Sequence, residues 1–331
     1  MNNYFVAVVA FAVSLLLEFV LLPMLKRGKA RQQILQYVTE HNGKNGTPTM
    51  GGIAFILAIG LVACLFCDLR IRGMIVMLCV FFAYGIVGFL DDFIKIRFRR
   101  NLGLKAYQKL AVQLAIAILV ALFVKNDIAT GSVLRLPFCD IQVDLGWWIV
   151  PLVVFVYLAC TNGVNLTDGI DGLASSTTIC FLFGIVLLLN KELDLLYRVG
   201  DTYAYNQTQQ VVKLCYISIG ALMAFLLFNC NNAKVFMGDT GSLALGALVA
   251  CSCIFTRMTL FIPIVGVMFV VSCLSVILQV VYFKVTKGKR IFLMAPYHHH
   301  LQKKGLSETR ICMVYCAVTL LVVCILMSFG V

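Results

Sequence analysis

The sequence is short of charge. Only 13% of the 331 residues are charged, whereas soluble globular domains carry about 25%. Hydrophobic residues make up 61% of the chain, and the mean hydropathy is +0.96. Apolar runs long enough to cross the roughly 30 Å hydrocarbon core of a bilayer recur along the whole length. These features exclude a water-soluble fold and predict an all-α polytopic membrane protein.

Acidic residues are the scarcer sign of charge. The chain has 15 Asp and Glu against 27 Lys and Arg, a formal net charge of +12. Such an excess can indicate nucleic-acid binding, but here the basic residues fall in short segments between apolar runs. Inner-membrane proteins collect Lys and Arg on their cytoplasmic side. We therefore predict no nucleic-acid partner and use the basic residues to orient the chain.

The sequence also lacks a second cysteine pair at zinc spacing. Fourteen cysteines are present, but Cys64 and Cys67 form the one C-x-x-C motif, and most of the others lie inside apolar runs. Cysteine in such runs acts as a small apolar residue. We expect neither a disulfide framework nor a cysteine-held metal cluster.

Ten apolar segments are long enough to be candidate transmembrane helices. Their approximate limits are 3–25, 51–67, 73–90, 107–125, 147–162, 173–190, 211–229, 241–256, 258–285 and 310–329. The fifth and eighth are short. The ninth is long, so we expect it to tilt or break, with Pro263 near its start as one cause.

Basic residues decide the orientation. The first segment begins without a positive leader, so no cleavable signal peptide is predicted, and charge follows it at Lys26, Arg27, Lys29 and Arg31. With both termini outside, the cytoplasmic side holds 19 of the 27 Lys and Arg. The prediction is a bacterial inner-membrane protein with a single domain over residues 1–331. Residues 126–146 would form a short external hairpin.

Five aspartates gather where this topology predicts the cytoplasmic face. Asp91 and Asp92 end the third segment, Asp168 and Asp171 follow the fifth, and Asp239 precedes the eighth. Carboxylates at a membrane boundary are costly unless solvated or paired, so a functional role is expected. Oxygen donors from separate segments suit Mg²⁺, which shares its coordination with substrate phosphates. Asp168 and Asp171, three residues apart, would share a face if helical.

Histidines and lysines complete the candidate site. His298, His299 and His300 are consecutive, so they cannot all face one point, and one or two are expected to orient a phosphate. Basic residues surround the acids at 95–109 and 284–290, and most of them fit anchors for anionic lipid headgroups. One or two would grip a diphosphate, and Lys109 is the preferred candidate.

Five stretches in order resemble the phospho-N-acetylmuramoyl-pentapeptide transferase family, within the polyprenyl-phosphate N-acetylhexosamine-1-phosphate transferases. They are NGTPTMGGIAF at 45–55, FLDDFIKI at 89–96, TNGVNLTDGIDGLA at 161–174, FMGDTGSLALG at 236–246 and APYHHHLQKKG at 295–305. Together they span nearly the whole chain. The histidine stretch favours the muramoyl-pentapeptide branch. Gln302 departs from the family pattern, in which many members place an acid.

The resemblance implies a homodimer with ten transmembrane helices and a Mg²⁺-dependent site on the cytoplasmic face. UDP-N-acetylmuramoyl-pentapeptide and undecaprenyl phosphate are the implied substrates; the implied products are the first lipid intermediate of peptidoglycan and UMP. It also implies roles for individual residues: catalytic Asp91, Asp92, His298 and His299, metal-binding and catalytic Asp239, and substrate-binding Asn165, Asp168, Gly169, Asp171, Asn229, Phe236, Lys109 and His300.

In the expected reaction, a phosphate oxygen of the lipid carrier attacks the β-phosphorus of the UDP-sugar, and UMP departs. Asp91 is the candidate base, and both a direct displacement and a two-step route fit the sequence.

Two alternatives stay open. Transfer of N-acetylglucosamine-1-phosphate is the nearest one. An ion-coupled transporter or flippase is the alternative from another class, but its acids should lie near mid-bilayer on broken helices.

Overall fold

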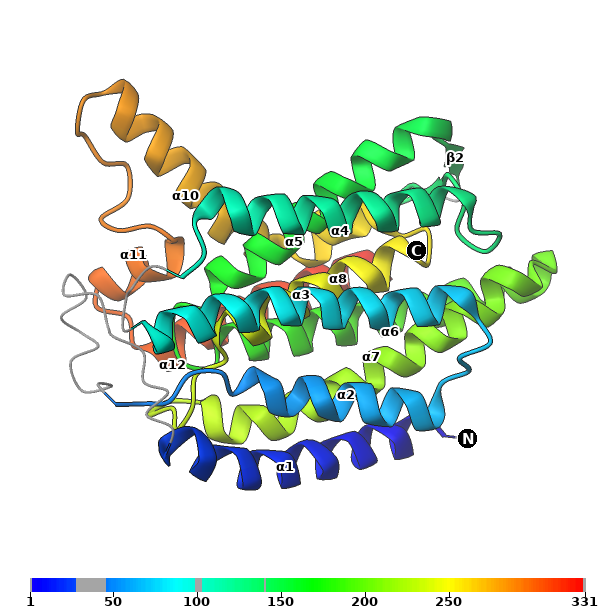
Figure 1. Ribbon diagram of the computed structural model, residues 1–331. Helices are drawn as coiled ribbons and strands as arrows, with labels where there is room; N and C mark the ends of the chain where they lie inside the picture. The colour runs from blue at the N-terminus through cyan, green and yellow to red at the C-terminus, as the bar shows by residue number, and fades with distance from the viewer. Residues whose placement is uncertain (1, 28–45, 99–102, 140, 330–331) are drawn as a thin grey trace.

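A computed structural model describes residues 2–27, 46–98, 103–139 and 141–329. The basic residues Lys29, Arg31, Arg99 and Arg100 lie outside the described residues, as does the start of the stretch at 45–55. The long helices lie side by side in one bundle (Figure 1). Its helices are α1 (Asn3–Arg27), α2 (Gly52–Phe66), α3 (Arg72–Arg97), α4 (Ala106–Asn126), α5 (Ile149–Thr167), α6 (Leu173–Val199), α7 (Thr202–Asn229), α8 (Gly238–Ile254), α9 (Ile262–Val265), α10 (Val267–Val285), α11 (Tyr297–Lys303) and α12 (Glu308–Ser328).

The predicted all-α polytopic class is confirmed. Within the described residues, eight helices are long and apolar enough to cross a membrane, and α2 and α8 are shorter apolar helices. Each of the ten predicted segments falls on one of these helices. The eighth stays short, at 17 residues, whereas the fifth is extended at its start by the turn η2 (Gly146–Trp148).

The ninth predicted segment is broken, as its length suggested. It consists of the turn η3 (Thr259–Phe261), then α9, and then α10 after an interruption at Gly266. Pro263 lies in the first turn of α9, a position that a residue without a backbone N–H tolerates. Beyond the break, α10 leaves the bundle (Figure 1), and only four of its residues are buried: Met268, Phe269, Ser272 and Ser275.

The predicted hairpin is also present. Strands β1 (Val133–Arg135) and β2 (Gln142–Asp144) pair antiparallel, with Leu134 opposite Val143. In Figure 1 this hairpin and both chain ends lie toward one end of the bundle, whereas α11 lies at the other. Both ends of the chain therefore share a side, as a ten-span topology requires.

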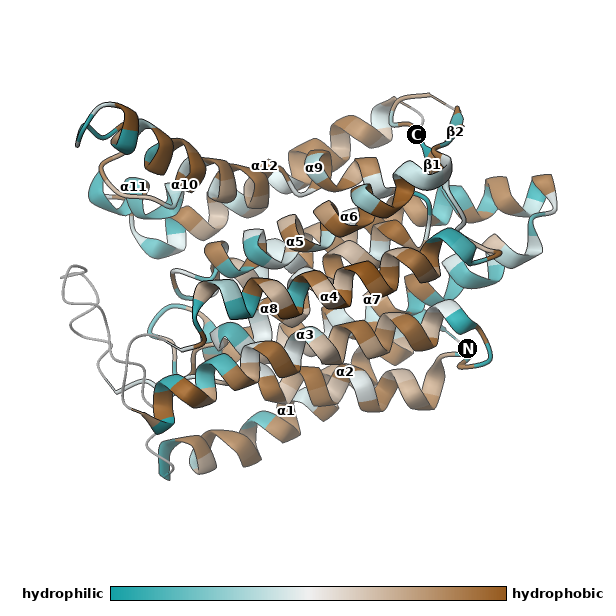
Figure 2. Cartoon of the chain, turned by 45° about the horizontal axis from the view of Figure 1, so that its top comes forward, coloured by the Kyte–Doolittle hydropathy of each residue, from teal (hydrophilic) through white to brown (hydrophobic). Residues whose placement is uncertain are grey.

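The core of the bundle is built around α8. Every residue of α8 from Thr240 to Ile254 is buried, and α3 and α5 pack against it. Small residues in GDTGSLALGALVA allow these helices to approach closely, which is how membrane helices associate. Figure 2 shows apolar colour along the helices and polar colour concentrated toward the two ends of the bundle. The start of α8 thus brings a polar sequence, GDTGS, to the centre of one end.

Candidate active site

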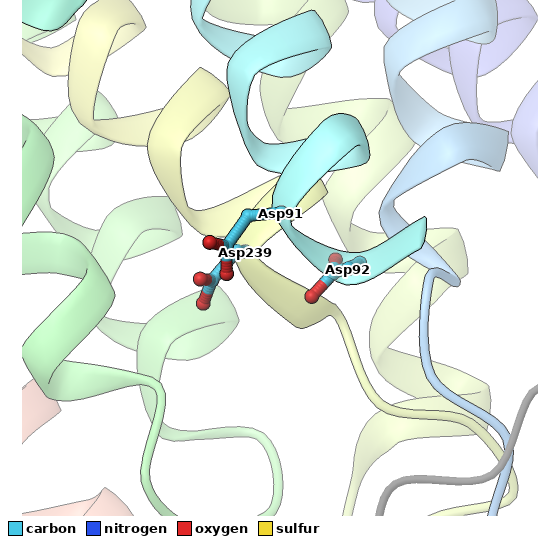
Figure 3. Close-up of side chains that lie close together, drawn as sticks. All are labelled: Asp91, Asp92 and Asp239. Carbon is cyan, nitrogen blue, oxygen red and sulfur yellow. The ribbon is translucent and has the colours of Figure 1, made fainter. Parts of the chain in front are cut away.

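Three carboxylates meet where α3 ends and α8 begins. Asp91 and Asp92 come from α3 and Asp239 from the first turn of α8, with one carboxylate oxygen of each within 4.8 Å of the others (Figure 3). The third predicted segment ends at about residue 90, with the acids at its boundary, whereas helix α3 extends further. The helix continues to Arg97, because FIKI extends its apolar pattern, so both acids are buried helical residues, each 3% exposed.

Two lysines reach the carboxylates. Lys95 Nζ lies 2.6 Å from Asp91 Oδ2, 2.9 Å from Asp239 Oδ2 and 3.8 Å from Asp92 Oδ1. Lys109 Nζ, from the first turn of α4, lies 2.8 Å from Asp239 Oδ2. Lys109 was the lysine predicted to bind the diphosphate, and Lys95 was not distinguished from the other basic residues. The spacing of Lys95, one turn after Asp91 on a helix, was the signal that could have identified it.

Neutral donors hold the carboxylates in place. Asn165 Nδ2 donates to Asp239 Oδ1 and to Ser242 Oγ, both at 2.8 Å. The backbone N–H and the hydroxyl of Thr240 both donate to Asp92 Oδ2, at 2.9 and 2.7 Å. The backbone N–H of Leu104 donates to Asp91 Oδ1 at 2.8 Å. Each acid therefore has a protein donor, as buried charged groups require.

Glycines allow the two helices to meet at this point. A Cβ on Gly88, one turn before Asp92, would lie 2.1 Å from the carbonyl oxygen of Asp239. Gly238 has φ +73°, a left-handed conformation, and its Cβ would lie 2.5 Å from Asp92 Oδ2. Any side chain at either position would push the carboxylates apart.

Asp168 and Asp171 lie in the turn between α5 and α6. This segment is not helical, so the two residues do not share a helical face. Asp168 follows the last residue of α5. Burial of its half-buried side chain and the nearby carboxylates of Asp239, Asp92 and Asp171 raise the pKa of Asp168 well above its usual range. Asp171 Oδ2 instead accepts from the backbone N–H of Ala233 at 3.0 Å.

The predicted substrate residues Asn229 and Phe236 flank the segment before α8. Asn229 is buried, donates to the carbonyl of Val235 at 3.0 Å and accepts from Ser175 Oγ at 3.2 Å. Its described contacts thus hold the segment in place. Phe236 is half-buried, and its backbone pairs with Pro48 and Gly51. The two segments at 48–52 and 235–237 therefore form one wall beside the carboxylates.

The three histidines do not all face one point, as expected of consecutive residues. His298 is fully buried, His299 is half-buried, and their rings are 4.3 Å apart. Both approach Gly169, since a Cβ there would lie 2.2 Å from His298 Nε2 and 3.1 Å from His299 Nε2. His300 turns away: its Nδ1 accepts from the N–H of Leu293 at 3.1 Å. Its partial burial and Lys304 lower the pKa of His300.

The predicted site residues thus occupy one end of the bundle. The structure brings Asp91, Asp92, Asp239, Lys109 and Asn165 into one contact network. The histidines form a second group beside the 168–172 turn. Thr240, Ser242 and Lys95 also belong to the first network, although they were not among the predicted site residues. Ser242 follows Asp239 by three residues, a helical spacing that could have identified it. Thr240 donates to Asp92, a contact that no spacing within GDTGS indicates.

The donor set suits a hard divalent cation. Three carboxylates offer oxygen ligands within 4.8 Å of one another, which is the chemistry that Mg²⁺ prefers. Counted formally, three negative charges face two ammonium groups, so the network has room for further positive charge. The predicted ligand, Asp239, is the member that contacts both lysines and Asn165.

Comparisons with known proteins show the family of the chain. A family model described as glycosyl transferase family 4 matches residues 74–257, more than half of the chain. A second, described as phospho-N-acetylmuramoyl-pentapeptide-transferase signature 1, matches residues 44–56. The first match contains Asp91, Asp92, Lys109 and Asp239, so the carboxylate network lies wholly within it.

Curated relatives cover nearly the whole chain. A protein of Clostridioides difficile (strain 630) is 39% identical over 95% of this chain and 94% of its own length. One of Bacillus subtilis (strain 168) is 41% identical over 96% and 94%. One of Clostridium botulinum (strain Eklund 17B / Type B) is 43% identical over 96% and 92%. Each of the three is named phospho-N-acetylmuramoyl-pentapeptide-transferase.

Proposed function

Because the chain belongs to the phospho-N-acetylmuramoyl-pentapeptide transferase family, we propose that its carboxylate network is the centre of that transfer reaction. The enzyme moves phospho-N-acetylmuramoyl-pentapeptide from UDP to undecaprenyl phosphate. The products are the first lipid intermediate of peptidoglycan synthesis and UMP. The relatives' shared name favours this reaction over transfer of N-acetylglucosamine-1-phosphate.

One observation carries the proposal: three carboxylates and two lysines meet at a single end of a lipid-embedded bundle. A transporter would place its acids near mid-bilayer on broken helices. Here the broken segment is η3–α10, and the acids lie on α3 and α8. The network instead offers a polar site at the level where a lipid phosphate and a soluble nucleotide can meet.

We propose that the enzyme depends on Mg²⁺ held by Asp239, with Asp91 and Asp92 close enough to assist. Bound there, the ion would polarise the diphosphate and stabilise the departing UMP. Lys95 and Lys109 add two positive charges beside the same carboxylates. Since both substrates are anionic, these ammonium groups reduce the repulsion between them.

Asp91 is the proposed base for the lipid phosphate. Its Oδ1 accepts from Leu104 N–H, and its Oδ2 faces Lys95, so the carboxylate is fixed on both sides. Asp92 is locked by Thr240 and acts mainly by orienting the network. A phosphate monoester is largely dianionic near neutral pH (second pKa about 6), so removal of a proton is a modest part of the task. Positioning and electrostatic stabilisation account for most of such a transfer.

The UDP end of the donor is assigned to Asn165 near the end of α5, the 168–172 turn and the wall that contains Phe236. Asn165 links this turn to Asp239. Gly169 lets the histidines approach the same turn, so His298 and His299 can orient a phosphate by hydrogen bonds from imidazole. His300 turns toward the backbone at Leu293. Its contact with substrate stays a prediction.

The test is turnover of purified protein in detergent. Undecaprenyl phosphate is paired separately with UDP-N-acetylmuramoyl-pentapeptide and UDP-N-acetylglucosamine, with and without Mg²⁺, and UMP release is followed. Mg²⁺-dependent UMP from the muramoyl substrate alone supports the proposal. Asp239→Asn should abolish turnover; near-normal activity at saturating Mg²⁺ would refute its role as a ligand. UMP from the N-acetylglucosamine substrate alone would move the enzyme to the sister branch.

We also propose that the carboxylate end faces the cytoplasm of a bacterial inner membrane and that the protein is a homodimer. The orientation follows from the 19 of 27 Lys and Arg assigned to that side. The dimer is inferred from the family resemblance alone. Accessibility of single cysteines near Asn3 to an impermeant thiol reagent tests the first, and the mass of the protein in detergent tests the second.

A further inference from the structure

A chain of hydrogen bonds runs from a histidine to the turn between α5 and α6. His299 Nδ1 lies 2.6 Å from Gln302 Oε1, and Gln302 Nε2 donates to Glu308 Oε1 at 3.3 Å. Glu308 Oε2 accepts from the backbone N–H of Asp171 at 3.2 Å. The chain thus links α11, the start of α12 and the turn that carries Asp168 and Gly169.

The chemistry of the side chains fixes the direction of each bond. The Glu308 carboxylate only accepts, so it selects the NH₂ group of the Gln302 amide. This orientation turns Gln302 Oε1, another acceptor, toward the ring of His299. His299 Nδ1 must therefore carry a hydrogen, since a bond between two acceptors is impossible. The network thereby selects one tautomer of His299.

The opposite ring nitrogen faces the turn. His299 Nε2 lies 3.1 Å from the point that a Cβ on Gly169 would occupy. Because Nδ1 already holds its hydrogen, any further proton taken up by the ring is placed on Nε2. That proton would point toward the turn assigned to the UDP end of the donor.

We propose that Gln302 and Glu308 are positioning residues, which fix the tautomer and orientation of His299 so that Nε2 presents its proton to a phosphate oxygen of the UDP-linked substrate. The inference rests on the proposed function, because that function supplies the substrate. Partners on the far nitrogen of a functional imidazole set which nitrogen acts. Gln302 is neutral, so the one formal charge in this chain of hydrogen bonds is on Glu308, which is separated from His299 by the Gln302 side chain.

Other titratable and charged groups lie on the neighbouring segments and must stay constant in any comparison of pH profiles. They are His298, His300 and Lys303 on α11, Lys304 directly after it, Asp168 and Asp171 in the turn, Glu308 and Arg310 on α12, and Lys284 at the end of α10. A useful variant therefore redistributes the charge of the chain without adding or removing any.

The experiment compares two variants of the full-length enzyme in detergent. Gln302→Leu removes the acceptor for Nδ1. The double variant Gln302→Glu with Glu308→Gln retains an acceptor at 302 and the total charge. It places an amide at 308 and moves the carboxylate next to His299. Thr309→Ala is the control, since this exposed and uncharged residue follows Glu308 on α12, outside the chain of bonds. Unfolding temperatures show whether each variant is folded.

The expected result is a fall of about tenfold in kcat/KM for the UDP substrate in Gln302→Leu, with the KM for undecaprenyl phosphate unchanged. The double variant should restore most of that activity. Its carboxylate stabilises the protonated ring, so the limb of the pH profile that reports His299 should move up by about one pH unit.

Two results would overturn the inference. One is a wild-type kcat/KM in Gln302→Leu; the other is a folded double variant that is as impaired as Gln302→Leu or has an unmoved pH limb. Absence of turnover in the wild-type enzyme would instead contradict the proposed function. The two failures are therefore distinguishable.

Discussion

Replacing Gly88 by alanine tests whether the contact between α3 and α8 sets the geometry of the carboxylates. The added Cβ would lie 2.1 Å from the carbonyl oxygen of Asp239 and 2.6 Å from the N of Thr240. Both are backbone atoms, so no side chain can rotate away. Ordinary contact begins at 3.4 Å, so the two backbones must separate by the difference, about 1.3 Å.

That displacement would move the carboxylates that we propose as the centre of the reaction. Asp92 lies one turn after Gly88 and is bonded to Thr240, and Asp239 is the residue that would be pushed. Errors of about 1 Å in the placement of catalytic groups can cost about 10²-fold in rate. We expect Gly88→Ala to lower kcat by about that factor while the protein still inserts and folds.

Gly85→Ala is the matched control. It lies on the same helix, one turn earlier, and its Cβ would meet a flexible methyl of Ile56 at 3.3 Å and Ala244 Cβ at 3.6 Å. UMP release and the unfolding temperature are measured for both variants. Near-normal turnover in Gly88→Ala, or equal losses in the two variants, would refute the reasoning that this contact positions the site.

Three further predictions concern charge. The unfolding temperature of Asp168→Asn, relative to that of the wild type, should increase as the pH rises from about 4 to about 8. The reason is that the raised pKa of Asp168 makes its ionisation destabilising. A constant difference between the two unfolding temperatures across that range would contradict this. Glu192→Gln should destabilise the protein by about 3–5 kcal/mol, since it leaves the buried Arg135 without its carboxylate, while turnover per folded molecule is retained. Lys95→Met should lower both the unfolding temperature and turnover, whereas Lys109→Met should mainly lower turnover; equal unfolding temperatures in the two lysine variants would argue against the difference.

Much of the fold could be predicted from the sequence, because membrane helices are encoded locally. A run of apolar residues specifies a span wherever it occurs. For the same reason the hairpin at Val133–Asp144 and the break after Pro263 were recognisable. Helix ends were less accurate: α3 extends seven residues past the predicted limit of 90, because apolar FIKI allows the helix to run on beyond the acids.

The arrangement of the site residues in space could not be predicted from local sequence patterns. The acids could be identified as a set, but their contacts join residues up to 148 positions apart. Nothing near Gly169 in the sequence indicates that it makes room for His298, or near Gln302 that it faces Glu308 rather than solvent. Such pairings depend on how α11 and α12 pack, which no single segment encodes.

The different roles expected of the two lysines follow from how burial is compensated. Lys95 contacts all three carboxylates, two of them buried on its own helix, so its ammonium offsets most of the cost of removing Asp91 and Asp92 from water. Among the described carboxylates, Lys109 pairs with Asp239, which also has Asn165 and Lys95 as partners. Loss of Lys109 therefore leaves every acid with a donor. We therefore expect that Lys109 can exchange its carboxylate partner for a substrate phosphate at little cost to the fold, whereas Lys95 is needed to keep the buried acids in place.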